Sequence, residues 1–334
     1  MKIVKYHYVR DFNDEKSKNL KGLDFNQFDF QLRYLKSNFN VLEPAQAHEK
    51  ILNLDFNPND CWLTFDDGYS DHFKFVYPKL TKYDIRATFF PTIAPFYSRK
   101  LLDVNKIHYI LASNNDYQFT YERIKFYYQK YQSKLKKSFT TKDAESDLSN
   151  ILKGLKSIHR WDNEEVIKIK RLLQYAIPNT IRHYICEKLF NEFVNFTEEE
   201  LADSLYMSIE NLIDLKENGH EIGIHGIDHL RWGTLNSKDQ EKEIINSYNF
   251  LKTRNLLDSS FSCCYPWGSY NNLTIKILKQ IGCKLALTSS LGEFTNTNKN
   301  FIFELPRFDT NDFPQSNLKE EDVFEPIIQN IQNI

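Results

Sequence analysis

The spacing of apolar and polar residues predicts a chain in which strands and helices alternate. Short apolar runs typical of buried strands occur at residues 3–7, 61–65, 86–91 and 221–224. Apolar residues at helical spacing occur at residues 26–38, 70–83 and 208–218, and the last of these segments stops at Gly219. The strand, helix and strand within residues 61–91 form a βαβ unit. The pattern therefore indicates an α/β fold.

The pattern changes in the middle of the chain. Residues 97–205 are polar and rich in lysine with scattered Tyr and Phe, which predicts several helices and almost no strand. We interpret them as a helical insertion subdomain in a domain formed by residues 1–96 and 206–334. Residues 121–137 mix Tyr, Phe and Lys, which is typical of a segment that contacts a lipid surface, a glycan or a protein. We favour the alternative that these aromatic side chains pack within the fold.

Two adjacent carboxylates stand at the end of an apolar strand. The sequence Thr-Phe-Asp-Asp-Gly at residues 64–68 places Asp66 and Asp67 directly before Gly68. Adjacent strand residues point to opposite faces, but a turn at glycine lets both carboxylates face one cleft. One can then bind a metal while its neighbour accepts a proton. The alternative is a simple turn in which Asp66 caps a following helix.

Two further motifs lie downstream. His225 and His229 are four residues apart, a spacing at which two imidazoles can meet on one centre. With a carboxylate they suit a divalent transition metal, and three protein ligands with open positions describe a catalytic site. The sequence Tyr-Pro-Trp-Gly at residues 265–268 predicts an irregular loop whose backbone amides can point at a ligand. Alone, each motif has an ordinary structural explanation.

Together and in this order, the three motifs resemble the polysaccharide deacetylase family, also called the NodB homology domain or carbohydrate esterase family 4. The resemblance covers residues 1–96 and 205–312 and leaves the middle of the chain unmatched. With the alternation of strands and helices, it implies a distorted (β/α) barrel with a large helical insertion. In such barrels the chemistry lies at the carboxyl ends of the strands, where the motifs fall.

The resemblance also implies roles for individual residues. Asp67, His225 and His229 become ligands of a single divalent metal, most often zinc, with Co²⁺, Mn²⁺, Ni²⁺ and Fe²⁺ as alternatives. Asp66 becomes the general base. The metal and the backbone amide of Trp267 hold the oxyanion that forms when water attacks an acyl carbonyl.

The chain departs from the family pattern in two places. Cys264 stands where many members carry an arginine that orients the base, and Arg307 is the candidate substitute, with a surface or core-edge arginine as the alternative. No histidine follows His229, so the late general acid of many members is absent. The early Tyr-His pair at residues 6–7 resembles the branch in which such a segment supplies the acid. His7 is therefore our candidate, with a reference pKa near 6.5, and a hydrogen-bonded histidine at a strand end is the alternative.

Aromatic residues near the motifs are candidates for substrate contacts. Sugar rings stack on aromatic faces, and Trp232 and Tyr265 lie close to the motifs in sequence. Core packing is the competing use of such side chains. The sequence leaves both alternatives open.

The composition of the chain limits the classes of function and the cellular compartment that we expect. The 334 residues are 41% hydrophobic, which is enough for one large core, and 43 Lys and Arg against 45 Asp and Glu give a net charge of -2. This balance gives no basic field for nucleic acid. The five cysteines are odd in number and two are adjacent, which indicates a reducing compartment and no disulfide framework. No signal-peptide pattern or membrane-spanning run is seen, so we expect a cytoplasmic protein if Met1 is the natural start.

The function predicted from these observations is that of a metal-dependent hydrolase. It would remove an acetyl group from an N-acetylated sugar of a polysaccharide, a glycolipid or a nucleotide sugar. One alternative is an O-acetyl esterase or deformylase, which uses the same oxyanion chemistry. Another is a catalytically inactive glycan-binding or scaffold protein on the same fold, which Cys264 favours and Asp66 disfavours, because a pure metal binder needs no base.

Overall fold

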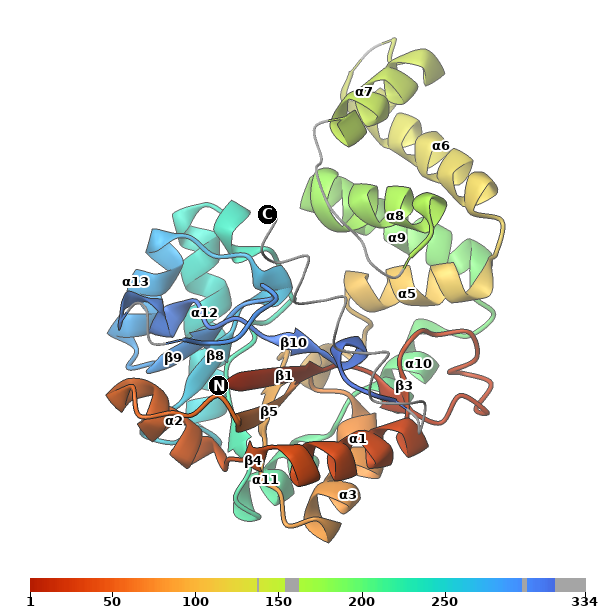
Figure 1. Ribbon diagram of the computed structural model, residues 1–334. Coiled ribbons are helices and arrows are strands. Elements are labelled where there is room, and N and C mark those ends of the chain that lie inside the picture. Colours follow the sequence, from red (N-terminus) through yellow and green to blue (C-terminus); the bar gives the residue numbers. More distant parts are fainter. Residues whose placement is uncertain (137, 154–161, 296–298, 316–334) are drawn as a thin grey trace. The chain divides into compact units, whose positions relative to one another are not determined.

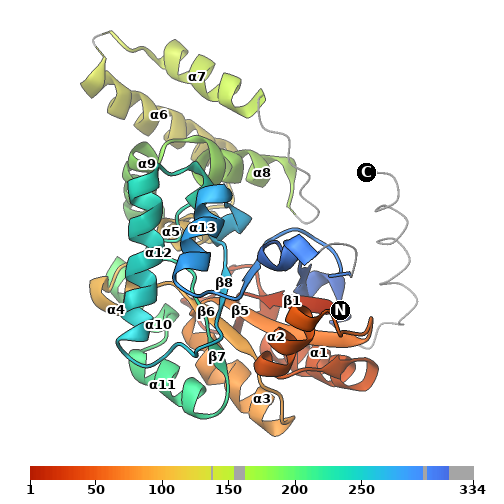
Figure 2. The same ribbon diagram turned by 90° about the vertical axis from the view of Figure 1, so that its left-hand side faces the viewer.

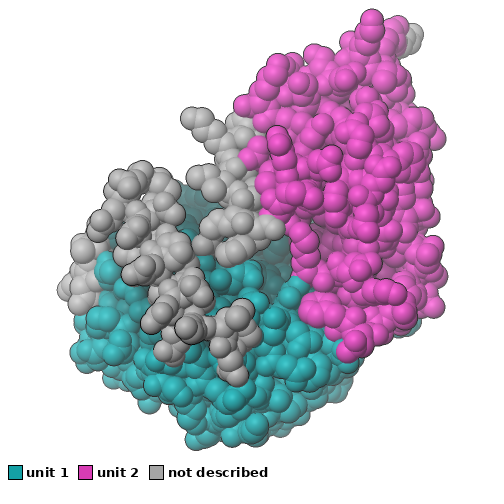
Figure 3. All heavy atoms as spheres, turned by 45° about the vertical axis from the view of Figure 1, so that its right-hand side comes forward, with its two compact units in different colours: residues 1–11, 22–99, 203–334 teal, residues 12–21, 100–202 magenta. Residues whose placement is uncertain are grey.

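The structure is a computed structural model that describes residues 1–136, 138–153, 162–295 and 299–315. The chain divides into two compact units (Figure 3). The first comprises residues 1–11, 22–99 and 203–334, and the second comprises residues 12–21 and 100–202. Residues 12–21, which the sequence pattern did not assign to the insertion, belong to the second unit.

Parallel strands form the wall of the first unit (Figures 1 and 2). Their order in the larger sheet is β10 (Phe308–Asp309), β1 (Lys2–Tyr6), β5 (Asp60–Asp67), β6 (Thr88–Pro91) and β7 (Glu221–Ile222), and β4 (Asn40–Val41) also pairs with β5. The strands β8 (Ser262–Cys264) and β9 (Leu285–Leu287) form a separate parallel pair, as do β2 (Val9–Arg10) and β3 (Leu23–Asp24).

Single parallel bridges join these pieces into a ring. Ile224, just after β7, pairs with Cys263 of β8, and Leu287 of β9 pairs with Leu305. Residues 305–309 then lead into β10, which pairs with β1. The ring therefore closes from β1 through β5, β6, β7, β8 and β9 back to β1. This is the distorted (β/α) barrel that the sequence predicted, with single bridges in place of full ladders at two joints.

Helices lie outside the strands of this unit (Figures 1 and 2). They are α1 (Phe25–Asn38), α2 (Pro44–Asn53), the π-helix η1 (His72–Val76), α3 (Tyr77–Lys82), α4 (Pro95–Ser98), α11 (Ile209–Glu217), α12 (Ser237–Lys252) and α13 (Asn272–Gln280). Short 3₁₀ turns occur at η3 (Trp232–Thr234), η4 (Pro266–Gly268), η5 (Lys299–Phe303) and η6 (Thr310–Asp312). Side chains cap several of the helices; Asp24, for example, accepts a hydrogen bond from the amide of Asn26 at the start of α1.

A row of stacked aromatic rings shows which face of β5 is turned toward the helices and which toward the barrel interior. Tyr6, Phe65 and Phe89 are aligned across β1, β5 and β6, and their rings stack at centroid distances of 4.8 and 5.0 Å. Phe28 of α1 packs edge-on against Tyr6 at 5.2 Å, so this is the face that the helices cover. Because side chains alternate along a strand, Asp66 points to the opposite face, into the barrel.

The second unit is helical. Its elements are α5 (Asp103–Ser113), α6 (Tyr117–Leu135), α7 (Thr141–Lys153), α8 (Glu164–Lys170), the π-helix η2 (Arg171–Ala176), α9 (Asn179–Phe193) and the first part of α10 (Glu198–Leu205). Along α6, Tyr121 and Tyr128 are buried, whereas Phe119 and Phe126 are 46% and 43% exposed. Lys137, the end of the segment 121–137, lies outside the described residues. Within the described part of the chain, no helix is both long and apolar enough to cross a membrane.

Candidate active site

The end of β5 turns sharply at the two carboxylates. Asp67 has a φ of +73° and Gly68 a φ of +75°, so the chain takes two successive left-handed residues. A Cβ on Gly68 would lie 2.8 Å from Cβ of Pro91, so the turn requires glycine on steric grounds as well. The turn leaves His225 beside both carboxylates, since its ring nitrogens lie within 4.8 Å of ligand atoms of Asp66 and of Asp67.

Asp67, His225 and His229 form the first cluster. The Oδ1 atom of Asp67 is 3.3 Å from Nε2 of His225 and 3.4 Å from Nε2 of His229. The Nδ1–H of His225 donates to the carbonyl of Cys264 at 2.7 Å, which turns Nε2 toward Asp67. Oδ1 of Asp67 is buried and accepts no hydrogen bond within the described residues. Three electron-pair donors thus converge, and these residues fit a divalent transition metal.

The charges in this cluster are strongly coupled. Burial alone would raise the pKa of Asp67, but His229 and His225 offset it and hold the pKa well below its usual value. Burial would lower the pKa of His225, but Cys264 and Asp67 raise it well above its usual value. Burial lowers the pKa of His229 to about 3, although Asp67 acts in the opposite direction. In the absence of a metal, His225 therefore keeps the proton that balances the charge of Asp67.

Arg307 and Asp66 form the second cluster. Nη1 and Nη2 of Arg307 donate to Oδ1 and Oδ2 of Asp66 at 2.9 and 2.8 Å, a bidentate ion pair between two buried side chains. The other N–H groups donate to the carbonyl of Thr288 at 2.9 Å, to Oγ1 of Thr64 at 3.1 Å and to Sγ of Cys264 at 2.9 Å. Burial would raise the pKa of Asp66, but Arg307 more than offsets it, so this carboxylate stays charged.

Cys264 lies between the two clusters. Its Sγ is 3.5 Å from Oδ2 of Asp66, and Asp66, His225 and Cys264 also place three potential ligand atoms within 4.8 Å of one another. The guanidinium of Arg307 already contacts both Asp66 and Cys264, so a cation there would meet a positive charge. The set with Asp67 and His229 is therefore the better metal site.

His7 lies at the exposed edge of this site. Its side chain is 45% exposed, and its Nε2 is 3.7 Å from Oδ2 of Asp66. Its backbone carbonyl accepts a hydrogen bond from Nε2 of the buried His72 at 2.7 Å. The backbone of His7 is therefore fixed while its imidazole reaches solvent beside the buried carboxylate.

The third motif places Trp267 against the metal ligands. Trp267 has a φ of +60°, its ring lies 5.0 Å from that of His229, and its Nε1–H donates to the carbonyl of His229 at 3.0 Å. Trp232 and Tyr265, by contrast, are buried, with at most 1% of either residue exposed. The hydroxyl of Tyr265 donates to the carbonyl of Phe303 at 2.9 Å. Rings enclosed in this way cannot stack on a sugar, so the expectation that they contact substrate is not supported by their burial.

Several residues of the site were not found by sequence reasoning. The hydroxyl of Tyr69 donates to Oδ2 of Asp67 at 2.8 Å, and its position two residues after Asp67 was a usable signal. Thr64 and His72 support Arg307 and His7 through contacts that join distant parts of the chain. Glu243 of α12, which accepts hydrogen bonds from the loop between the two histidines, had no sequence signal either.

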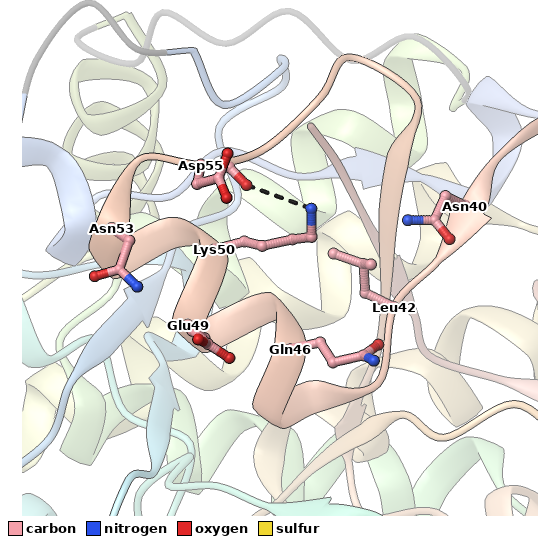
Figure 4. A pocket seen from close by; sticks show the side chains of 7 residues that line it. All are labelled: Asn40, Leu42, Gln46, Glu49, Lys50, Asn53 and Asp55. Atoms are coloured by element: carbon pink, nitrogen blue, oxygen red, sulfur yellow. Dashed lines mark hydrogen bonds between the residues drawn. The ribbon is translucent and has the colours of Figure 1, made fainter.

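A surface hollow of about 340 Å³ lies elsewhere, beside α2 and β4 (Figure 4). Lys50 and Asp55 are among its lining residues, and the Nζ of Lys50 donates to the carbonyl of Asp55 at 3.3 Å. It shares no lining residue with the two clusters, so it belongs to a different part of the surface.

Comparison with known proteins agrees with the motifs. The profile of a family described as polysaccharide deacetylase matches residues 54–100 and 192–286, which include Asp66, Asp67, His225 and His229. Over these two segments the chain is similar to the polysaccharide deacetylase family. YxkH of Bacillus subtilis (strain 168), a protein named as a polysaccharide deacetylase, is 34% identical over 91 residues. That match covers 26% of this chain and 30% of YxkH, so it spans less than a third of the relative.

Solved structures show the same fold. The Streptococcus pyogenes deacetylase PplD, solved in complex with acetate, has a TM-score of 0.55 at 16% identity, covering 92% of this chain and 91% of that chain. IcaB from Ammonifex degensii has a TM-score of 0.51 at 15% identity, covering 92% and 89%. At these identities the similarity concerns the fold of the chain.

Proposed function

We propose that this protein is a metal-dependent N-deacetylase that releases acetate from an N-acetylated saccharide. The observation that carries the proposal is the pairing of two buried carboxylates with different partners. Asp67 faces two imidazole nitrogens, and Asp66 is held by Arg307 and faces His7. A site that only binds a metal needs the first carboxylate and has no use for the second.

Asp67, His225 and His229 would hold the metal, and their nitrogen and oxygen donors make Zn²⁺ the first candidate. Co²⁺, Mn²⁺, Ni²⁺ and Fe²⁺ accept the same donors. When bound, such a cation lowers the pKa of water and polarises an acyl oxygen. The hydrogen bond from His225 to the carbonyl of Cys264 keeps Nε2 available as a ligand, and Tyr69 fixes the carboxylate of Asp67.

Asp66 would act as the general base. Arg307 holds both of its oxygens, so the carboxylate is charged and fixed in orientation before substrate arrives. A carboxylate with a low pKa is a weak base, which suffices for a water whose own pKa is lowered. Asp66 takes the proton as the water oxygen bonds to the acetyl carbon.

His7 and Trp267 would complete the reaction. His7, at the exposed edge, would give a proton to the amine nitrogen as the C–N bond breaks, which leaves acetate and a free amino sugar. The backbone amide of Trp267 would donate to the oxyanion of the tetrahedral intermediate. The left-handed φ of Trp267 and the anchoring of its ring on His229 keep that amide close to the ligands.

The test is acetate release from a panel of N-acetylated and O-acetylated saccharides, including nucleotide-linked and lipid-linked forms. We expect release from an N-acetyl sugar by the metal-loaded protein, and loss of release in chelator-treated protein and in Asp66→Asn. The Asp66→Asn variant should keep its metal, because Asp66 is outside the ligand set. Release only from O-acetyl sugars would replace the proposal with an esterase. Bound metal without release from any member would favour a non-catalytic glycan-binding protein.

A further inference from the structure

The loop between the two histidines is held from behind by one buried carboxylate. Glu243, on α12, is 4% exposed. Its Oε2 accepts hydrogen bonds from the backbone amides of Ile227 at 3.0 Å and Asp228 at 3.3 Å, and from the indole N–H of Trp232 at 3.4 Å. These amides belong to residues between His225 and His229, so a single side chain on a neighbouring helix binds the segment that spaces the two imidazoles.

The other polar groups of the same loop are also engaged. The carbonyls of Gly226 and Ile227 accept hydrogen bonds from the amides of Ile93 and Ala94, both at 3.1 Å. The carbonyl of His229 accepts the indole N–H of Trp267. Neutral groups make all of these bonds, whereas Glu243 supplies a carboxyl group that accepts several N–H donors at once in a buried position. Burial, together with the charge of Asp228, raises the pKa of Glu243 to about 7.

The packing around Gly226 leaves no room for a side chain at that residue. Gly226 has a φ of +79°, and a Cβ there would lie 2.9 Å from Oε2 of Glu243 and 2.9 Å from the ring of Trp232. The carboxylate therefore sits directly under the residue that follows His225. This close approach needs a glycine at residue 226 and an acceptor at residue 243.

We propose that Glu243 is a positioning residue that sets the separation of His225 and His229 and thereby the affinity of the metal site. The inference rests on the proposed function, because it takes these two histidines as ligands. Supporting groups of this kind typically change metal affinity about 10–100-fold when they are removed. Glu243→Gln keeps the shape of the side chain. Depending on its orientation, the glutamine presents to the loop amides either an N–H₂ group, which cannot accept their hydrogen bonds, or a carbonyl oxygen, which is a weaker acceptor than a carboxylate.

The experiment compares the metal-stripped full chain with three variants. Glu243→Gln removes the carboxyl group, Glu243→Asp keeps it on a shorter side chain, and Glu241→Gln removes an exposed carboxyl group two residues earlier on the same helix. Zn²⁺ affinity is measured by competition with a chromophoric chelator, and ligand geometry by the visible absorption spectrum of the Co²⁺ form. All variants are compared at a temperature where circular dichroism shows each to be folded.

We expect Glu243→Gln to bind Zn²⁺ about 10–100-fold more weakly with an altered Co²⁺ spectrum. Glu243→Asp should recover most of the affinity, and Glu241→Gln should match the wild type. A Glu243→Gln variant with the Zn²⁺ affinity and the Co²⁺ spectrum of the wild type would overturn the inference. An equal loss of Zn²⁺ affinity in Glu243→Gln and Glu243→Asp would overturn it as well. Either result would leave the proposed function standing. A wild-type chain that binds neither metal would overturn both.

Discussion

Replacing Arg307 with methionine tests how the base is held. The variant Arg307→Met keeps an unbranched apolar side chain but removes every donor to Asp66, Thr64, Cys264 and the carbonyl of Thr288. Asp66 then stays in the barrel interior without its counter-charge. The loss of one partner from a buried ion pair costs about 3–5 kcal/mol, because the other charge remains buried.

The pH dependence of this loss has a definite sign. In the wild type, the pKa of Asp66 is held below its usual value, so the ion pair stabilises the fold above the unfolded-state pKa of about 3.9. That stabilisation is lost only as the pH falls through the lower folded-state pKa. In Arg307→Met, the largest group that opposes burial is gone and His7 and His225 oppose it alone, so the pKa of Asp66 rises relative to the wild type. The variant's penalty is therefore full at neutral pH and disappears as Asp66 takes up a proton on acidification.

The assay is urea denaturation of metal-free protein at about pH 7.5 and about pH 4.5. The matched control is Arg99→Met, because Arg99 pairs with Asp203 at the surface of the same unit, with both side chains about half exposed. Surface pairs of this kind contribute about 0–1 kcal/mol. The double variant Asp66→Asn with Arg307→Met removes the stranded charge, and it should regain stability at the higher pH.

We expect Arg307→Met to be less stable than wild type by about 3–5 kcal/mol at the higher pH, with a smaller difference at the lower pH. A difference no larger than that of Arg99→Met would refute the reasoning. So would a difference that is the same at both pH values, because it would mean that lost packing, and not a buried charge, causes the instability.

Three further predictions follow from the same contacts. His7→Gln should lower turnover by about 10²- to 10⁴-fold without changing Zn²⁺ affinity, since His7 faces Asp66 and is not a ligand, and equal turnover would exclude it as the acid. Zn²⁺ affinity should fall about tenfold for each pH unit below neutrality, because the pKa of His225 is raised and the metal must displace the proton that His225 holds. Chelator competition measures the affinity across this pH range, and an affinity that does not change with pH would contradict the prediction. Gly223→Ala should destabilise the fold by about 1–3 kcal/mol in thermal melts, because its Cβ would lie 2.4 Å from the ring of Phe90. The control is Gly282→Ala, whose Cβ would meet nothing within 4 Å and which carries only the cost of a positive φ, a cost that Gly223 does not have.

The chain order of the motifs was enough to predict the barrel and the residues that meet in its site. The predicted strands near residues 61–65 and 86–91 match β5 and β6, and the helix at residues 26–38 matches α1 within a residue. Periodicity works there because these elements each bury one face or both. The closure of the ring could not be predicted from the sequence, because β7, β8 and β9 have only two or three residues each, and single bridges join Ile224 to β8 and β9 to Leu305.

The sequence predicted the candidate metal ligands better than it predicted the residues that hold them in place. Asp67, His225 and His229 carry their chemistry in their residue types and spacing, so the structure brings together side chains that the sequence had singled out. The sequence left two alternatives for Arg307, a partner of Asp66 or a surface or core-edge arginine. Only the three-dimensional path of residues 305–309 places it against Asp66. Tyr265 and Trp232 could not be assigned, because a sequence shows that a residue is aromatic but not whether its ring is enclosed.

The segment that closes the ring also carries the arginine that pairs with Asp66. Asp67, His225 and His229 all precede residue 230, whereas Arg307 lies in the segment that closes the ring between β9 and β1. During synthesis the three proposed metal ligands are therefore made before Arg307. In the proposed function, the residues that hold the metal and the residue that orients Asp66 thus come from separate parts of the chain, and loss of the closing segment would remove Arg307 without removing Asp67, His225 or His229.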